Sequence, residues 1–175
     1  PIIETINIAL FSSILALFTA LLLLPILTNV LFKFKIIPKL FSAVFSIFRT
    51  IPFLIIAAIL VSLFSTGVFS GFVSIYLINL LTAAKLLKEY AEEVEVKQIE
   101  AMESLGSSKF VIYKNAILSN LKPQVVSVYF LTLESSIRGA SVLGLVGAGG
   151  IGQRLWQELN HLRYDRVSII IITLV

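Results

Sequence analysis

Three ionisable residues lie in or beside long apolar stretches of the sequence, where a charge is costly. Glu134 and Arg138 are four positions apart within the apolar segment 123–146, so they share one face of a helix and can pair. Arg49 has no acidic residue within one helical turn. A charged side chain at the centre of a bilayer costs about 2.5–3.5 kcal/mol on insertion scales, so such residues face a protein interior or a water-filled cavity. We expect these three residues to line a polar pathway through a membrane.

Each of these residues also has a purely structural interpretation. Glu134 and Arg138 can neutralise each other without contacting any solute. Arg49 can be an interfacial arginine, since it lies about 15 Å along a helix from Lys39. If Arg49 and Arg138 instead line a pathway, their guanidinium groups suit a phosphonate, a phosphite or a phosphate ester, because the planar fork matches tetrahedral oxyanions. The sequence leaves both interpretations open.

The glycine-rich segment 147–152 satisfies the pattern G-x-G-x-x-G of dinucleotide-binding loops. That pattern marks a nucleotide site only between the strand and the helix of a βαβ unit, and here apolar spans are expected on both sides. We therefore interpret Gly147, Gly149, Gly150 and Gly152 as an external glycine turn, where glycine permits close helix packing and non-helical backbone inside protein.

Other arrangements that could perform chemistry are missing from the sequence. It has no cysteine and one histidine, His161, so we expect neither a disulfide framework nor a metal cluster. The phosphate-binding pattern G-x-x-x-x-G-K-[ST] does not occur, and neither does a Ser/His/Asp or paired-carboxylate arrangement. We expect that the chain is not an enzyme and that it binds no metal or cofactor of its own.

The composition is that of an integral membrane protein. Hydrophobic residues make up 58% and charged residues 14% of the 175 residues, against roughly 45–50% and about 25% in soluble chains. No charged residue occurs in the intervals 5–32 and 50–84, and each interval exceeds the roughly 20 apolar residues that a span needs. The net charge of +4 is not spread over polar surface, so no nucleic acid is expected as a partner.

The apolar segments predict an all-α, polytopic transmembrane bundle. We expect one membrane domain over residues 1–175, with spans at about 5–32, 40–65, 68–88 and 123–146 and a partial span at 166–175. Pro25 predicts a kink in the first span, and the small residues around Gly67 predict a tight turn. Because the chain begins without Met and its last apolar run stops at Val175, we expect a fragment that is incomplete at both ends.

The basic residues between the spans predict the orientation, because Lys and Arg collect in cytoplasmic connections. The connection after the first span carries Lys33, Lys35 and Lys39, the turn around Gly67 carries none, and the stretch 85–122 carries six lysines. The first and third connections are therefore predicted to be cytoplasmic. The fourth connection is then external, although it contains three arginines beside two acids.

The connection 89–122 predicts two amphipathic helices joined by a glycine turn. Ile99, Met102 and Leu105 recur every three residues and would share one face. Gly106 then ends the first helix, and Ser107 or Ser108 caps the second. The second helix would carry an apolar stripe of Phe110, Tyr113, Ala116, Ile117 and Leu121. Such a hairpin could lie on lipid headgroups or dock a cytoplasmic partner, and amphipathicity alone favours neither.

Three stretches resemble permease subunits of ATP-binding-cassette importers. The stretch Glu100–Gly106, followed by Pro123, resembles their EAA motif, with Met102 in place of the second Ala. The segment 140–152 and the stretch Arg49-Thr50-Ile51-Pro52 resemble permeases of the phosphonate type. The three matches come in the expected order and cover about residues 45–175.

The resemblance implies the fold of a type I importer permease and a role in ATP-driven, binding-protein-dependent uptake of a phosphonate or a related oxyanion. It implies that the segment 89–122, hereafter the coupling segment, docks a separate ATPase subunit, which binds ATP and Mg²⁺. The residues implied in this contact are Glu100, Ala101, Met102, Leu105, Gly106, Phe110 and Tyr113. The other implied partners are an extracytoplasmic binding protein and a second copy of the chain, and the implied location is the bacterial plasma membrane.

Two other functions compete with this interpretation. The chain could be an ion channel or secondary transporter that uses Arg49, Glu134 and Arg138 as an ionic relay. It could also be a membrane anchor without transport activity. The source of energy separates these functions, because only the importer depends on a separate ATPase.

Overall fold

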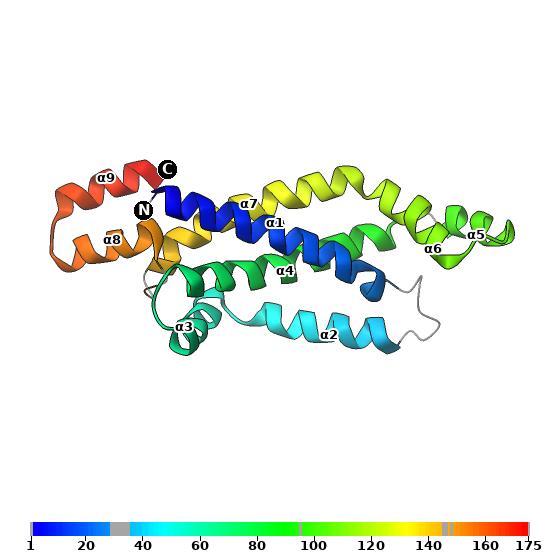
Figure 1. The fold of residues 1–175 in the computed structure, drawn as a ribbon, viewed down its shortest axis with the longest axis horizontal. Coiled ribbons are helices and arrows are strands. Elements are labelled where there is room, and N and C mark those ends of the chain that lie inside the picture. The colour runs from blue at the N-terminus through cyan, green and yellow to red at the C-terminus, as the bar shows by residue number, and fades with distance from the viewer. Residues whose placement is uncertain (1, 29–35, 95, 145–146, 148, 175) are drawn as a thin grey trace. The chain divides into compact units, whose positions relative to one another are not determined.

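The computed structural model describes residues 2–28, 36–94, 96–144, 147 and 149–174. Every element of secondary structure in these ranges is helical (Figure 1), so the expected all-α architecture is confirmed. The elements in chain order are α1 (Ile2–Leu27), α2 (Ile36–Thr50), α3 (Phe53–Phe64), α4 (Val68–Glu92), α5 (Val96–Ser104), α6 (Lys109–Ile112), the π-helix η1 (Tyr113–Leu118), α7 (Lys122–Leu143), α8 (Gly150–Asn160) and α9 (Tyr164–Leu174). The predicted connection with Lys33 and Lys35, and part of the glycine-rich segment, lie outside the described residues.

Two of the described helices, α1 and α4, are long and apolar enough to cross a membrane. The helix α1 continues to Leu27, two residues beyond Pro25. The helix α4 continues to Glu92, four residues beyond the predicted end of its span, because Lys85 and Lys88 pair with acids one turn later and support the helix.

The predicted span 40–65 is divided into α2 and α3. Pro52 has the extended backbone angles φ −56° and ψ 136°. It has no N–H to donate, and its ring disfavours helical geometry at Ile51, so α2 ends at Thr50. The Pro52 carbonyl accepts a hydrogen bond from the N–H of Ile55 at 2.9 Å and starts α3. Together, residues from Lys39 to Phe64 have the length and composition of a broken span or of a re-entrant loop.

The chain forms two compact units, and each has an apolar core. Unit 1 comprises residues 1–15, 51–79 and 132–175, and its core contains Ile8, Ala57, Ile75, Ala140 and Leu143. Unit 2 comprises residues 16–50 and 80–131, and its core contains Ala20, Leu24, Ala83, Ala84, Leu87, Tyr113, Ile117, Leu121 and Val128. Because α1, α4 and α7 each contribute residues to both units, neither unit is a continuous stretch of chain. That residues 1–175 form one membrane domain stays a prediction.

Within unit 1, the turn predicted around Gly67 is present between α3 and α4. Gly67 adopts φ +144° and donates its N–H to the carbonyl of Gly147 at 3.0 Å. This bond ties the turn to the glycine-rich segment, which lies 80 residues later in the sequence.

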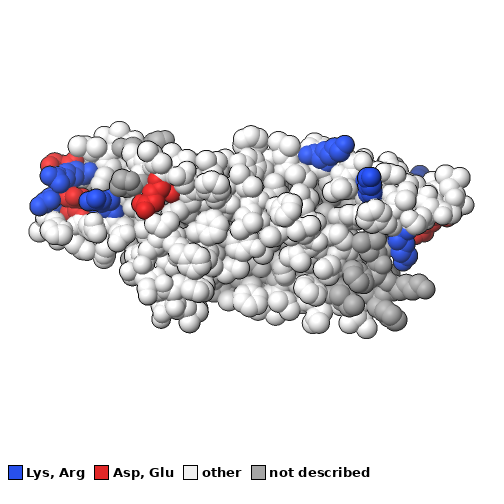
Figure 2. Space-filling view, in the orientation of Figure 1, with Lys and Arg blue, Asp and Glu red and all other residues white. Residues whose placement is uncertain are grey.

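The predicted fourth connection contains a helix of its own, α8, which lies beside α9 in Figure 1. The Glu158 side chain is only 14% exposed and lies 3.6 Å from a guanidinium nitrogen of Arg163 and 3.6 Å from one of Arg166. Figure 2 shows a cluster of basic and acidic side chains over α8 and α9, apart from an acidic group near the start of α1. Glu158 thus offsets part of the positive charge of this connection. That charge is unexpected for a connection predicted to lie outside the cell.

Candidate functional site

The coupling segment has the predicted helix, glycine turn and helix. Gly106 adopts φ +75°, which favours glycine, and its N–H donates to the carbonyl of Glu103 at 2.9 Å. The N–H of Ser107 donates to the carbonyl of Met102 at 3.0 Å, so both bonds close the end of α5. The hydroxyl of Ser108 then accepts the N–H of Val111 and caps α6.

The coupling segment has an exposed apolar tip and a buried base. Leu105 is 84% exposed and Phe110 is 67% exposed, whereas Tyr113 and Ile117 are buried in the core of unit 2. The predicted stripe is therefore wrong at Phe110, and Ile112 is buried instead. The π-helix η1 explains the difference, because its i→i+5 bonding shifts the register of the residues before it relative to those after it.

The other residues predicted for the ATPase contact lie on α5 beside the tip. Glu100 and Ala101 are exposed and Met102 is half-buried. Tyr113 holds the segment to unit 2, and burial raises the pKa of its phenol above the ordinary value of 10.0. The phenol is therefore neutral at physiological pH. Its contribution to stability is complete below pH 10.0 and is lost as the pH rises through its raised pKa.

Glu134 and Arg138 form the predicted pair on α7. A guanidinium nitrogen of Arg138 donates to a carboxylate oxygen of Glu134 at 2.5 Å. The side chains are 71% and 78% exposed, so the folded chain does not bury either charge. Arg138 also lines a cavity of about 260 Å³ in unit 1, together with Asn79 and Ser135.

Sequence analysis missed the polar residues beside this cavity. The amide of Asn79 on α4 donates to the hydroxyl of Ser136 on α7 at 2.6 Å, and Ser136 donates to the carbonyl of Thr132. All three side chains are buried. The spacing of Thr132 and Ser136, one helical turn apart in an apolar helix, was the available signal.

Arg49 lies in unit 2, whereas Arg138 lies in unit 1. Arg49 lines a cavity of about 120 Å³ with Ser42, Lys85 and Lys88. In the sequence, the two lysines indicate only the orientation of the chain in the membrane. The structure places them in the last turns of α4, facing α2.

The glycine-rich segment permits close approach of the backbone, as predicted. Gly147, Gly149 and Gly150 adopt φ of +77°, +82° and +70°, and Gly152 is buried in the first turn of α8. A Cβ at Gly150 would lie 2.7 Å from the hydroxyl of Thr5 on α1. The same Thr5 hydroxyl accepts the N–H of Ile151 at 2.9 Å and so serves as the acceptor at the start of α8.

Replacing Thr5 by Val should lower the free energy of unfolding by about 1–2 kcal/mol, because the buried N–H of Ile151 loses its acceptor. Thr5→Ser keeps the hydroxyl and should stay within about 0.5 kcal/mol of the wild type. Denaturant titration in detergent micelles measures both values. Equal stability of Thr5→Val and the wild type would show that the bond is unimportant.

Residues 21–175 match the family of binding-protein-dependent transport system inner membrane components. The chain belongs to this family. It is 34% identical over 132 residues to the putative phosphite transport system permease protein HtxE of Stutzerimonas stutzeri, which covers 74% of the chain and 49% of HtxE. It is 29% identical over 126 residues to the phosphite transport system permease protein PtxC of the same organism, which covers 72% of the chain and 46% of PtxC. The chain thus spans about half the length of these two relatives.

The chain has the same fold as a solved transporter structure. A chain in the inward-facing structure of the MetNI methionine ABC transporter superposes with a TM-score of 0.77, covering 98% of this chain and 89% of that one. Their sequence identity is 24%. The family match confirms the resemblance to importer permeases, and the solved structure confirms the fold of a type I importer permease. The family places this permease in the bacterial plasma membrane as a multi-pass protein.

Proposed function

We propose that this permease is the membrane subunit of an ATP-driven importer that takes up a phosphonate, a phosphite or a related oxyanion. The observation that carries the proposal is the exposed apolar tip of the coupling segment, Leu105 and Phe110, on a chain of this family. The relatives whose names include phosphite support the substrate class. The MetNI neighbour supports the fold alone, since its identity is below one quarter.

The exposed tip suits docking of a protein better than contact with lipid headgroups. Leu105 lies next to a tight turn that Gly106 closes. The helix η1 that follows α6 anchors this turn to the core of unit 2 through Tyr113 and Ile117. A rigid tip can transmit a displacement, whereas a floating amphipathic hairpin cannot. Glu100 and Ala101 beside it supply a carboxylate for a basic partner group and a small side chain for close approach.

The exposed pair of Glu134 and Arg138 supports a second copy of the chain as a partner. If α7 crosses the membrane, as the sequence predicts for 123–146, an ion pair on it cannot face lipid without a cost of several kcal/mol. This face of α7 is therefore covered by another permease subunit or lines a water-filled pathway between two subunits. Arg138 would then attract an anionic substrate, while Glu134 limits how tightly it is held.

The mechanism follows from these contacts. Closure of two ATPase subunits around ATP and Mg²⁺ moves the docked coupling segments, and the helices switch rigidly between inward-open and outward-open arrangements. The binding protein delivers the anion on the outer side. A channel or secondary transporter would need no such partner, and uptake in reconstituted vesicles that persists after inactivation of the ATPase would favour it. A complete absence of uptake would favour a membrane anchor.

A cysteine at Leu105 is expected to crosslink to the ATPase subunit, because this side chain is 84% exposed at the proposed contact. The sequence has no cysteine, so the label is unique within it. The matched control is Leu162→Cys, which is also exposed but lies in the α8–α9 turn. Crosslinks are measured in the assembled importer. Equal capture of the ATPase by both variants, or by neither, would overturn the proposed contact.

A further inference from the structure

A small cavity with charged and apolar lining residues lies between α2 and α4 within unit 2. It has a volume of about 120 Å³. Its polar lining consists of Ser42, Ser46 and Arg49 on α2 and of Lys85, Lys88, Glu89 and Glu92 on α4. Because a water molecule occupies about 30 Å³, the cavity has room for the equivalent of about four waters. This is enough for a phosphite-sized ion and too little for a nucleotide.

The helix α2 supplies one wall of this cavity from a single face. Ser42, Ser46 and Arg49 are spaced four and three residues apart, so they lie one above the other. Arg49 has no ion pair or hydrogen bond with the residues that the structure describes. Its planar fork is therefore available to a ligand in the cavity.

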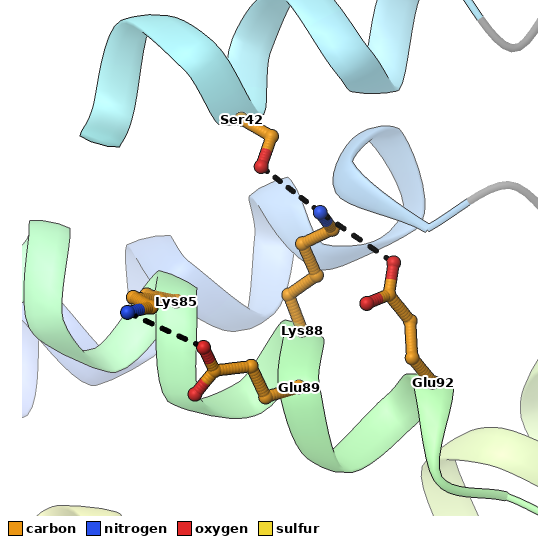
Figure 3. Close-up of polar contacts among 5 residues, drawn as sticks. All are labelled: Ser42, Lys85, Lys88, Glu89 and Glu92. Atoms are coloured by element: carbon orange, nitrogen blue, oxygen red, sulfur yellow. Dashed lines mark hydrogen bonds and ion pairs between the residues drawn. The ribbon is translucent and has the colours of Figure 1, made fainter. Parts of the chain in front are cut away.

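The opposite wall, on α4, still has a hydrogen-bond donor that is not in use. The ammonium group of Lys88 donates to the hydroxyl oxygen of Ser42 at 2.9 Å and lies 3.5 Å from a carboxylate oxygen of Glu92 (Figure 3). An ammonium has three N–H donors, so one remains. Ser42 uses its oxygen as an acceptor, which leaves its own O–H to donate. A ligand that only accepts hydrogen bonds fits this arrangement.

The charges of the cavity also favour an anion. Lys85 pairs with Glu89 at 3.4 Å and Lys88 pairs with Glu92 at 3.5 Å, so the two pairs cancel and Arg49 leaves a formal charge of +1. Partly exposed pairs of this length contribute about 0–1 kcal/mol, so they can rearrange around a ligand. A metal cation would instead meet the protons of Lys88 and the charge of Arg49.

We propose that this cavity binds one tetrahedral phosphorus oxyanion, held by the fork of Arg49, the ammonium of Lys88 and the hydroxyl of Ser42. The proposal deepens the proposed function and rests on it for the claim that this anion is the transported one. A free phosphite or phosphonate and the phosphate of an anionic lipid headgroup share the required chemistry, and the test separates these two sources.

The test measures binding of sodium phosphite and methylphosphonate by ³¹P NMR to the complete permease–ATPase complex in nanodiscs. Arg49→Gln should weaken phosphite binding about tenfold or more, because a charged, forked contact is lost. Arg49→Lys, which keeps the charge without the fork, should bind with intermediate affinity. Ser42→Ala should weaken binding about threefold or more. The control Lys39→Gln removes an exposed charge on α2 outside the cavity and should bind phosphite as the wild type does.

The lipid source is tested in nanodiscs with and without phosphatidylglycerol. Phosphite binding in the absence of this lipid identifies a solute site. A headgroup site would give a different result. The complex would then bind no phosphite, and native mass spectra would show that the wild type retains phosphatidylglycerol whereas Arg49→Gln does not. Either result supports the oxyanion cavity. Wild-type affinity for both ligands in folded Arg49→Gln and Ser42→Ala complexes would overturn it.

Uptake separates this inference from the proposed function. The wild-type importer with its binding protein should accumulate phosphite or methylphosphonate when ATP is supplied. If the wild type takes up the anion and the cavity variants bind phosphite as tightly as the wild type, the proposed oxyanion site is wrong and the proposed function stands. Binding that depends on Arg49 without any ATP-driven uptake would overturn the proposed function and leave the oxyanion cavity in place.

Discussion

Gly144→Ala is expected to destabilise the permease strongly, although it adds only one methyl group. A Cβ at this position would lie 1.7 Å from the backbone carbon of Gly152 and 2.0 Å from the nitrogen of Gln153. Backbone atoms cannot turn aside as a side chain does, so the end of α7 and the start of α8 must separate. Ordinary overpacking costs about 1–3 kcal/mol, and we expect a loss of stability above about 3 kcal/mol here. Thermal unfolding in detergent, with the yield of folded protein, measures the loss.

Gly139→Ala is the matched control for this substitution. Its Cβ would lie 3.3 Å from the tip of the Phe53 ring, a side chain that can shift by a few tenths of an ångström. In addition, alanine favours a helix by about 1 kcal/mol over glycine. We therefore expect a change of less than about 1 kcal/mol in this variant. A Gly144→Ala protein that is as stable as the Gly139→Ala protein would show that α7 and α8 do not approach each other closely.

Gly106→Val is expected to uncouple ATP hydrolysis from transport. Gly106 adopts φ +75°, and no other atom lies within 4 Å of a Cβ placed there, so the cost is backbone strain alone. A β-branched residue with positive φ costs about 1–3 kcal/mol, which corresponds to roughly 5–150-fold in the population of the native turn. We therefore expect the rate of ATP-driven uptake to decrease about 5–150-fold while the ATPase continues to hydrolyse ATP. Uptake and hydrolysis are measured together in reconstituted vesicles.

Gly106→Asn provides the control for the turn, because asparagine tolerates positive φ better than other residues with a side chain. Since the position is open, Asn should retain most of the uptake. If Val and Asn reduce uptake equally, the side chain itself disturbs the docked partner, and the conformational explanation is wrong. Normal coupling in Gly106→Val would count against a functional role of this turn.

Local signals in the sequence predicted the helical architecture and the form of the coupling segment. Uncharged intervals longer than one span require helices in a membrane, because every backbone polar group must be satisfied inside the segment. Gly106 and Ser108 act on their own neighbours, through a positive φ and a side-chain cap, so their roles could be predicted without tertiary contacts. The pairing of Glu134 with Arg138 is local for the same reason.

Contacts between distant segments decided the features that the sequence did not predict. Asn79 bonds to Ser136 across 57 positions, and Lys88 bonds to Ser42 across 46. Nothing in the neighbourhood of either residue indicates its partner, because helix packing selects the pair. The π-helical register of η1, which exposes Phe110 and buries Ile112, also depends on the core against which Tyr113 and Ile117 pack.

The sequence by itself determined that this protein is an apolar helical membrane protein with a glycine turn between two amphipathic helices, because composition and backbone preference act over a few residues. Only the tertiary structure decided that Arg49, Ser42 and Lys88 share one cavity and that Gly144 contacts the backbone of Gly152. Cavities and close approaches arise where two helices pack together, and the sequence of one helix does not indicate which helix packs against it.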